Sequence, residues 1–402
     1  MKPIYLDNNA STQVDAEVVQ AMLPFFLNQF GNASSMHDSG GAARAAIKTA
    51  RRQLQALTGA KFDHEIALTS GGTESVNTAI LSGLEMDRGR TEIVTSAVEH
   101  PAALTLCAHL EKTRGVKVHR IPVDHHGRLD LDAYGTALTH RVAIVSIMWA
   151  NNETGTIFPV ERLAEMAKQV GAVFHADAVQ AVGKHAMDLK STAIDMLSLS
   201  GHKLHGPKGV GALYIKHDAA FDALIRGGHQ ERGRRAGTEN TPGIVGLGKA
   251  AELALERTDE ENKRVKSLRD RLERGLLERI PGTFVTGDPL ARLSNTTNVA
   301  FDRIAGEAIQ FVLNRHGIAC ASGSACTSGS SVQSHVLTAM NIRHVTPLGA
   351  VRFSFSRYNR DEDVDRVLAL MPGIVAKLRD GAPVSRGRPT RLLEPASSTR
   401  DR

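Results

Sequence analysis

Short apolar runs typical of β-strands alternate with amphipathic helical stretches over the first two-thirds of this 402-residue chain. This alternation constrains the fold most, because it is typical of a mostly parallel sheet covered by helices. Several runs are apolar at every position, as in strands buried on both faces. We predict strands at residues 66–69, 92–95, 116–121, 142–148, 172–175, 196–199 and 210–215. The sequence therefore predicts an α/β fold.

The pattern changes near residue 259. A long charged helix carries Val265, Leu268, Leu272 and Leu276 on one face, followed by strands at 297–301 and 351–355 with a helix near 307–315 between them. A last helix begins near Asn359 and turns Val364, Leu368, Met371 and Val375 inward. These elements predict a second, smaller α+β domain.

Composition excludes several classes of protein. The chain is 42% hydrophobic and 23% charged, and no apolar run approaches the ~20 residues of a membrane helix. Half of the net charge of +6 falls in residues 381–402, an Arg/Pro/Ser-rich segment typical of a flexible tail, so we predict no nucleic-acid binding. The N-terminus has no signal-peptide pattern, and we expect a cytoplasmic protein.

A lysine and an aspartate follow two of the apolar runs. Lys203 lies in the glycine-rich segment at 200–209, where a desolvated amine could form a Schiff base; an isolated turn lysine is more often only solvated. Asp177 ends another apolar run, at the sheet edge where a carboxylate can hold a pyridinium nitrogen protonated. A helix cap is an equally good interpretation of Asp177 alone.

Other turns after apolar runs carry polar side chains. The turn at 69–75 contains Gly71 and Gly72 and opens a helix, which favours phosphate binding, although it lacks the lysine of nucleotide-binding loops. His100 could cover a flat ring and shuttle protons, and Asn152 could bind a phenolic oxygen. As single residues, both are more often part of local structure.

Histidines and cysteines give no clear metal site. Residues 124–126 read Asp-His-His before a glycine, which is more typical of a polar turn than of a metal site. Cys107 lies in an apolar helical stretch and is predicted to be core. Cys320 adjoins an apolar segment, whereas Cys326 lies among small polar residues of the low-complexity segment 319–331 and is the better nucleophile candidate. A metal clip made by this pair stays open.

One arginine lies inside the predicted strand at 351–355. A buried guanidinium needs an anion, and a substrate carboxylate could bind Arg352 with two hydrogen bonds. A structural ion pair is an equally good interpretation.

Together these segments resemble the pyridoxal-phosphate-dependent cysteine desulfurases of the NifS/IscS class. The resemblance runs from residues 5–10 to the strand of Arg352, with SGHKLHGPKG at 200–209 and SGSACTSG at 322–329 as its most specific motifs. It implies an aspartate-aminotransferase-like fold (fold type I of pyridoxal-phosphate enzymes) with a large cofactor domain of residues 14–258. It also implies a small domain of residues 1–13 and 259–380, a mobile catalytic loop at 319–331, and a homodimer with active sites at the interface.

The resemblance also implies residue roles. Lys203 resembles the lysine that binds the cofactor covalently, Asp177 the partner of the ring nitrogen, and His100 the ring-stacking acid–base residue. Arg352 resembles the clamp for the substrate carboxylate and Cys326 the catalytic cysteine. The other implied contacts are Gly72, Thr73, Ser200, Gly201 and His202 around the phosphate, Asn152 and Gln180 near the phenolic oxygen, with Asn152 also binding substrate, and Thr238, which the other subunit supplies.

The activity implied is the conversion of L-cysteine to L-alanine, with the sulfur left as a persulfide on Cys326. An iron–sulfur scaffold protein is the implied acceptor, so Cys326 would meet metal only transiently, through its persulfide and a nascent cluster. The loop beginning at Ala321 and the Arg/Pro/Ser tail favour the nitrogen-fixation-associated branch, which supplies nitrogenase clusters. Alternatives are a selenocysteine lyase or another lyase or transaminase on the same scaffold, and a non-catalytic iron–sulfur carrier that uses Cys320 and Cys326.

Overall fold

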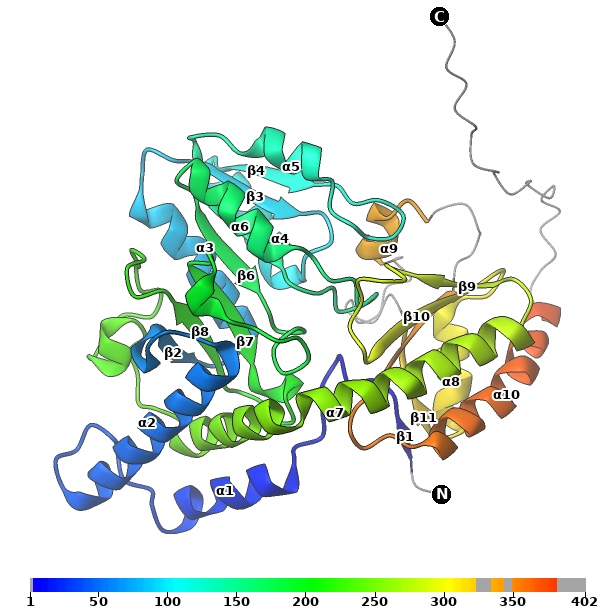
Figure 1. Ribbon diagram of the computed structural model, residues 1–402, viewed down its shortest axis with the longest axis horizontal. Helices are drawn as coiled ribbons and strands as arrows, with labels where there is room; N and C mark the ends of the chain where they lie inside the picture. Colours follow the sequence, from blue (N-terminus) through cyan, green and yellow to red (C-terminus); the bar gives the residue numbers. More distant parts are fainter. Residues whose placement is uncertain (1–2, 323–333, 343–348, 382–402) are drawn as a thin grey trace, which may run out of the picture.

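The computed structural model describes residues 3–322, 334–342 and 349–381. Figure 1 shows two bodies side by side, each built around its own sheet, with the long helix α7 running beneath both. The larger body comes from the first two-thirds of the chain and the smaller from the last third. In the part of the chain described, no helix is both long and apolar enough to cross a membrane.

The larger body contains a seven-stranded sheet in the order β2-β8-β7-β6-β5-β3-β4. Only β8 runs antiparallel to its neighbours, so the sheet is mostly parallel, as the sequence predicts. Every predicted strand is present, because buried strands of a parallel sheet need apolar side chains on both faces. The strands are β2 (Ile66–Thr69), β3 (Glu92–Ser96), β4 (Lys117–Ile121), β5 (Val142–Met148), β6 (Val173–Asp177), β7 (Met196–Ser200) and β8 (Gly211–Ile215).

Helices cover both faces of this sheet. One face packs on α3 (Gly72–Met86) and α4 (Pro101–Arg114). The other packs on α2 (Asp38–Thr58), α5 (Leu131–Ala137), α6 (Val160–Gln169) and the first half of α7, and α1 (Ala16–Leu27) lies against α7. Short 3₁₀ helices are η1 (Asp63–Glu65), η2 (Leu189–Ser191), η3 (Gly201–Lys203) and η4 (Gln230–Gly233).

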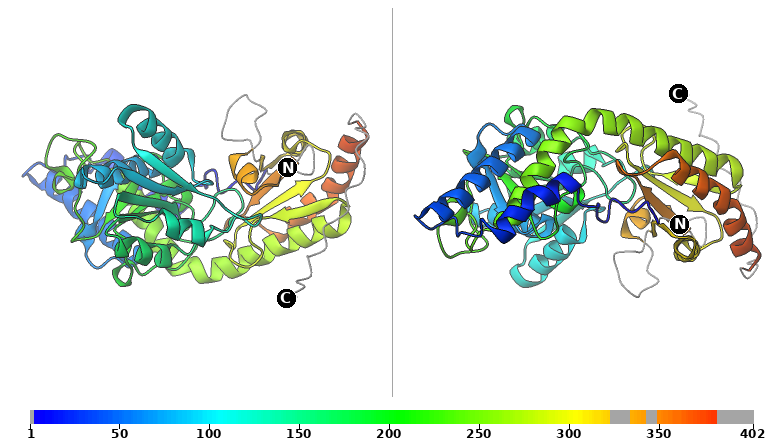
Figure 2. Two further views of the ribbon diagram at one scale, coloured as in Figure 1. Left: turned by 90° about the horizontal axis from the view of Figure 1, so that it is seen from above. Right: turned by 90° about the horizontal axis from the view of Figure 1, so that it is seen from below.

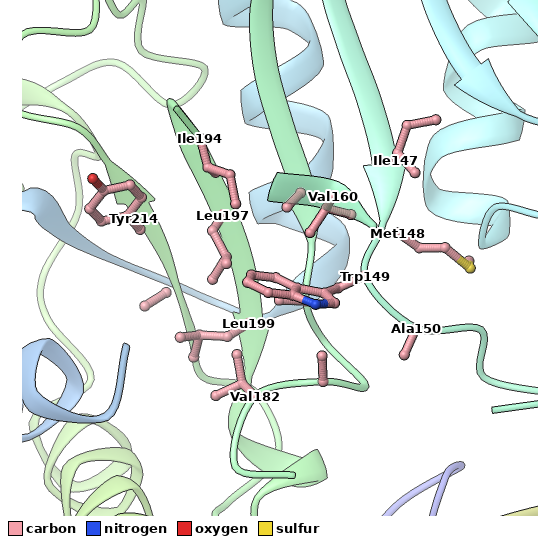
Figure 3. Close-up of a cluster of buried hydrophobic side chains, with 14 of the residues drawn as sticks. Ile147, Met148, Trp149, Ala150, Val160, Val182, Ile194, Leu197, Leu199 and Tyr214 are labelled. Atoms are coloured by element: carbon pink, nitrogen blue, oxygen red, sulfur yellow. The ribbon is translucent and has the colours of Figure 1, made fainter. Parts of the chain in front are cut away.

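The core on the second face continues to the end of β5. Trp149 directly follows this strand and is 2% exposed, and its indole lies close to Val160 and Leu199 (Figure 3). Close packing of so large a side chain fixes the path of the chain where it leaves the sheet. The turn that follows, which includes Asn152, is therefore held in a defined position.

The smaller body has an antiparallel sheet in the order β12-β13-β10-β9. Its strands are β9 (Thr283–Thr286), β10 (Thr296–Phe301), β12 (Ala321–Ser322) and β13 (Gly349–Ser354), and β1 (Ile4–Tyr5) pairs in parallel with β11 (Ile318–Ala319). Its other helices are α8 (Gly306–Arg315), α9 (His335–Ala339) and α10 (Asp361–Asp380), and α10 lies beside α7 (Figure 2). The eight predicted inward-facing residues of α7 and α10 all lie in its core.

Two segments connect the bodies. Helix α7 (Thr241–Arg279) is continuous through residue 259, and its two ends belong to different cores. The N-terminal segment leaves the small sheet, where the Asn8 N–H donates to the Ser354 carbonyl, and reaches η3, where the Thr12 N–H donates to the His202 carbonyl. This segment therefore brings β13 and η3 to one place. The domain boundaries given above stay a prediction.

Candidate active site

A cavity of about 490 Å³ lies where the two bodies meet. The carboxyl ends of β5, β6 and β7 form one side of it, and β12, β13 and the N-terminal segment form the other. Ligands in sheets of this kind bind at the carboxyl ends of the strands. Of the predicted site residues, the cavity is lined by Gly72, Thr73, His100, Asn152, Asp177, Gln180, Ser200, His202, Lys203 and Arg352.

Lys203 is the last residue of η3, directly after β7. Its Nζ donates to the carbonyls of Asn9 at 2.5 Å and Ala10 at 2.8 Å. Both acceptors belong to the N-terminal segment, so the amine is directed to the seam between the two bodies. Neighbouring His202 has its pKa lowered to about 4 by burial and by the charges of Lys203, Lys208 and Lys184.

Asp177 ends β6 and is 7% exposed. Its Oδ1 accepts a hydrogen bond from the Val179 N–H at 3.0 Å. Burial raises the pKa of this carboxyl to about 6, against the opposing effects of that hydrogen bond and of the charge of Lys203. At neutral pH the cavity therefore contains a buried carboxylate that would gain from a cationic partner.

The turn before α3 exposes backbone N–H groups to the cavity. Gly71 has a φ of 149°, which other residues rarely adopt, and it precedes Gly72 and Thr73 in the first turn of this 15-residue helix. A Cβ on Gly72 would lie 2.7 Å from Val179 Cγ2, so the close approach of these segments requires glycine there. The first N–H groups of a helix have no intrahelical acceptor, and they favour an anion.

His100 caps α4 through its side chain. Its Nδ1 accepts from the Ala102 N–H at 3.1 Å, which places the proton of the neutral ring on Nε2. Desolvation of the ring, followed by the charges of Lys203 and His335, lowers the pKa of this imidazole. The ring is therefore neutral near pH 7, with Nε2 able to donate.

Arg352 lies on β13 with its side chain 9% exposed. Its Nη2 is 2.6 Å from Asp7 Oδ1, and its Nη1 donates to the Asn152 carbonyl at 2.9 Å. The buried Nε has no hydrogen-bond partner among the described residues. The structure thus contains a structural ion pair, Arg352 with Asp7, which is one of the two interpretations of the sequence. The Nε donor of Arg352 remains for a further acceptor.

Asn9 lines the cavity and connects these groups. It is 1% exposed, and its carbonyl accepts from Lys203 Nζ and from Gln180 Nε2, the latter at 2.9 Å. Its own Nδ2 donates to the Asn152 carbonyl at 3.0 Å. The N-terminal segment is therefore part of the site and not only a link between the sheets.

Three predicted positions lie outside this cavity or outside the described residues. Gly201 packs against the chain instead, with its N–H donating to the Val210 carbonyl. Thr238 is exposed beside a separate hollow that Ser70 also lines. Cys326 and most of the segment 319–331, like nearly all of the tail 381–402, lie outside the described residues.

The other two cysteines are buried. Cys107 is 0% and Cys320 is 4% exposed, and burial raises the pKa of each thiol to about 12. Thiols of this kind are unreactive near neutral pH, which confirms Cys107 as a core residue. The described residues hold no group of three His, Cys, Asp or Glu side chains arranged for a metal, and Asp124 accepts from two backbone N–H groups in a polar turn.

Sequence reasoning missed several polar residues around the site. Asp7 and Glu153 line the cavity, and Glu153 Oε2 accepts from Ser334 Oγ at 2.6 Å. The carbonyl of Glu99 accepts from His335 Nε2 at 2.9 Å. For Glu99 and Glu153, the sequence offers one indication of a role in the site: like Asp177, they lie near the carboxyl ends of apolar strands.

Known proteins resemble this chain over nearly its full length. Residues 4–367 match the aminotransferase class-V family. The chain belongs to that family. This membership and the solved structures described below confirm the predicted fold class and the resemblance to the NifS/IscS class.

Curated relatives are named cysteine desulfurases. One from Sinorhizobium fredii is 73% identical over 96% of this chain and 100% of its own length. Cysteine desulfurase NifS from Azotobacter vinelandii is 57% identical over 95% of each chain. A solved structure of a NifS-like protein has a TM-score of 0.87 and 36% identity, covering 94% of this chain and all of the other.

Proposed function

We propose that this protein is a pyridoxal-phosphate-dependent cysteine desulfurase that converts L-cysteine to L-alanine and transfers the sulfur to Cys326. One observation carries the proposal: Lys203, Asp177 and the glycine turn at Gly72 line a single cavity at the carboxyl ends of parallel strands. This set matches an aldehyde, a pyridine nitrogen and a phosphate. Relatives at 73% and 57% identity bear the same name, cysteine desulfurase.

The residues present fit the cofactor. The N–H groups of the first turn of α3, together with Ser200 and His202, would hold the phosphate, and a larger residue than Gly72 would collide with Val179. The buried Asp177 carboxylate would pair with the ring nitrogen, and Gln180 and Asn152, which line the same cavity, would contact the phenolic oxygen. When bound, pyridoxal phosphate supplies an electron sink for the substrate's α-carbon.

The chain's own groups supply binding and proton transfer. Arg352 would bind the substrate carboxylate through its unpartnered Nε and a remaining N–H of a neighbouring nitrogen, because a guanidinium forms two parallel hydrogen bonds with a carboxylate. Lys203 Nζ would hold and move the α-proton, since an amine at the seam can leave the Asn9 and Ala10 carbonyls for the cavity. His100 would exchange a proton at Nε2.

Sulfur transfer is assigned to Cys326. Its thiolate would attack the substrate sulfur, so that an S–S bond forms while the C–S bond breaks and its electron pair stays on the carbon that becomes alanine. The persulfide would then pass to an iron–sulfur scaffold protein, with a nitrogenase-related role as the more specific proposal. The described cysteines are poor candidates because burial raises their pKa values.

A homodimer is part of the proposal. Val19, Leu23, Phe26 and Leu27 on α1 are 40–68% exposed, as is Phe30 at 79%, and apolar side chains gathered in this way favour a protein partner. Thr238 is exposed, as a residue offered to a second subunit must be. The cytoplasmic location stays a prediction.

Mass spectrometry after addition of L-cysteine tests the function. We expect alanine in stoichiometric excess over enzyme when an added thiol accepts the sulfur, and one extra sulfur on the peptide containing Cys326 when no thiol is added. Cys326→Ala should keep the cofactor's absorption band and lose alanine formation from cysteine. Turnover of selenocysteine without turnover of cysteine would favour the lyase alternative. Cluster absorption on a chain that binds no cofactor would favour the iron–sulfur carrier.

A further inference from the structure

A second lysine lies behind the cavity, in a position that the proposed reaction does not use. Lys184 Nζ donates to the backbone carbonyl of Gln180 at 3.1 Å and to the side-chain Oε1 of Gln180 at 3.2 Å. Lys184 and Lys203 line the same small pocket, whereas Gln180 lines the main cavity. Lys184 therefore contacts the cavity indirectly, because it binds Gln180 and Gln180 lines the cavity.

The surroundings of Lys184 disfavour the charged form of its amine. Among the described residues no carboxylate oxygen lies within 4 Å of its Nζ, and burial lowers its pKa to about 7, with the charge of Lys203 acting in the same direction. The residue as a whole is only half-buried, but its amine is desolvated and has no carboxylate in contact within the described part of the chain, and groups whose pKa values are perturbed in this way gather at functional sites.

The contact to Oε1 determines how the Gln180 amide is oriented. In its charged form the amine only donates, so the atom that faces charged Lys184 is the amide oxygen. The amide nitrogen then faces the other way, where one N–H donates to the Asn9 carbonyl at 2.9 Å. The second N–H of this nitrogen remains for the cavity. The Asn9 carbonyl favours the same orientation, because it can only accept a hydrogen bond. Without Lys184, one of the two contacts that hold this orientation would be lost, and the alternative with an oxygen facing the cavity would become less unfavourable.

We propose that Lys184 is a positioning residue: by binding Gln180 Oε1 it keeps an amide N–H, and not a carbonyl oxygen, directed at the phenolic oxygen of the bound cofactor. The proposal rests on the proposed function and specifies how one contact of that site is maintained. A donor at that oxygen stabilises its negative charge, whereas a carbonyl oxygen would repel it.

Several charged groups surround Lys184 and contribute to any pH dependence. Glu261 on α7 raises its pKa, whereas Lys203 on η3 and Arg352 on β13 lower it. The other titratable groups nearby are His202 and His205, whose pKa values the charge of Lys184 itself lowers, and Arg357, which lines the same pocket. A test must therefore separate the orientation of the amide from the loss of a nearby positive charge.

The test is a pH titration of the absorption spectrum of the enzyme loaded with pyridoxal phosphate. Lys184→Met removes the ammonium and keeps the length of the side chain. We expect the spectral transition to move up by about one pH unit, because the phenolic oxygen loses its donor and the cofactor keeps its proton to higher pH. Lys190→Met is the matched control, because Lys190 is exposed and pairs with Asp188. The spectral transition of this variant should lie at the wild-type pH.

A double-variant cycle separates the two effects. If Lys184 acts through Gln180, Lys184→Met should cause no further shift in a Gln180→Ala background. Equal shifts in both backgrounds would mean that the charge of Lys184 acts directly through space, and this result would overturn the proposal. Thermal unfolding of each apo-protein, together with Lys184→Gln as a second variant, identifies any variant that simply fails to fold.

Failure of this inference is distinguishable from failure of the proposed function. A wild-type protein with no cofactor absorption would contradict the function. A wild-type protein with the expected band and a Lys184→Met transition at the same pH would contradict only the role of Lys184.

Discussion

The Arg352 guanidinium and the Asp7 carboxylate lie 2.6 Å apart, and they come from opposite ends of the chain. The Asn152 carbonyl holds a second nitrogen of the same guanidinium. The cation that we propose binds the substrate carboxylate is therefore oriented before substrate enters. This preorganisation reduces the ordering cost of binding.

Asp7→Asn should weaken substrate binding more than turnover. The amide keeps the size of the side chain but replaces a charge-assisted hydrogen bond with a neutral one, a loss of about 1 kcal/mol, which corresponds to a roughly fivefold rise in KM for cysteine. Steady-state kinetics measure this, with Asp87→Asn at the exposed pair with Arg90 as control. A fall in KM would mean that Asp7 competes with the substrate carboxylate.

Asp177→Asn should stabilise the apo-protein in a pH-dependent way. Because burial raises the pKa of Asp177 to about 6, the folded state binds its proton more tightly than the unfolded state, and wild-type stability falls as pH rises from about 4 to about 6. The asparagine variant lacks this loss of about 1–3 kcal/mol. Thermal unfolding should show a clearly larger advantage of the variant at pH 8 than at pH 4.5; an equal difference at both would contradict it.

Gly72→Ala should weaken cofactor binding. The added Cβ would lie 2.7 Å from Val179 Cγ2, and such overpacking costs about 1–3 kcal/mol, here by displacing the turn that would hold the phosphate. We expect roughly tenfold lower affinity for pyridoxal phosphate by titration of the apo-protein. Val179→Ala should restore most of this affinity in the double variant, and an unrelieved defect would contradict the steric explanation.

Ser334→Ala should slow sulfur transfer without changing cofactor binding. Ser334 Oγ donates to Glu153 and accepts from two N–H groups of α9, and loss of such a helix cap costs about 1 kcal/mol. This residue follows the segment that contains Cys326. We expect severalfold slower persulfide formation in rapid-quench mass spectrometry, with an unchanged absorption spectrum. Ser334→Thr keeps the hydroxyl and should behave like the wild type.

Local patterns predict much of this fold. The strand at 142–148 is apolar or small at every position and buried throughout, so its own sequence identifies it. The polar turns after such strands likewise predict Asp177 and Lys203 as neighbours at one sheet edge, where the structure places them.

Contacts between distant segments could not be predicted in this way. Asp7 is far from Arg352 in sequence, and nothing local shows that the N-terminal segment runs beside β13. Lys184 looks like an ordinary turn lysine until Gln180 and the pocket around it are known. The change of pattern near residue 259 indicates a boundary, yet α7 is continuous there, because the polar residues between its two cores face solvent or are only half-buried.

Borohydride reduction of the pyridoxal-phosphate-loaded protein, followed by peptide mass spectrometry, tests the central claim most directly. The account predicts the reduced cofactor on one peptide, attached to Lys203, with none on Lys184 and none after Lys203→Ala. Attachment to a different lysine, or a cofactor that is never covalently bound, would contradict it.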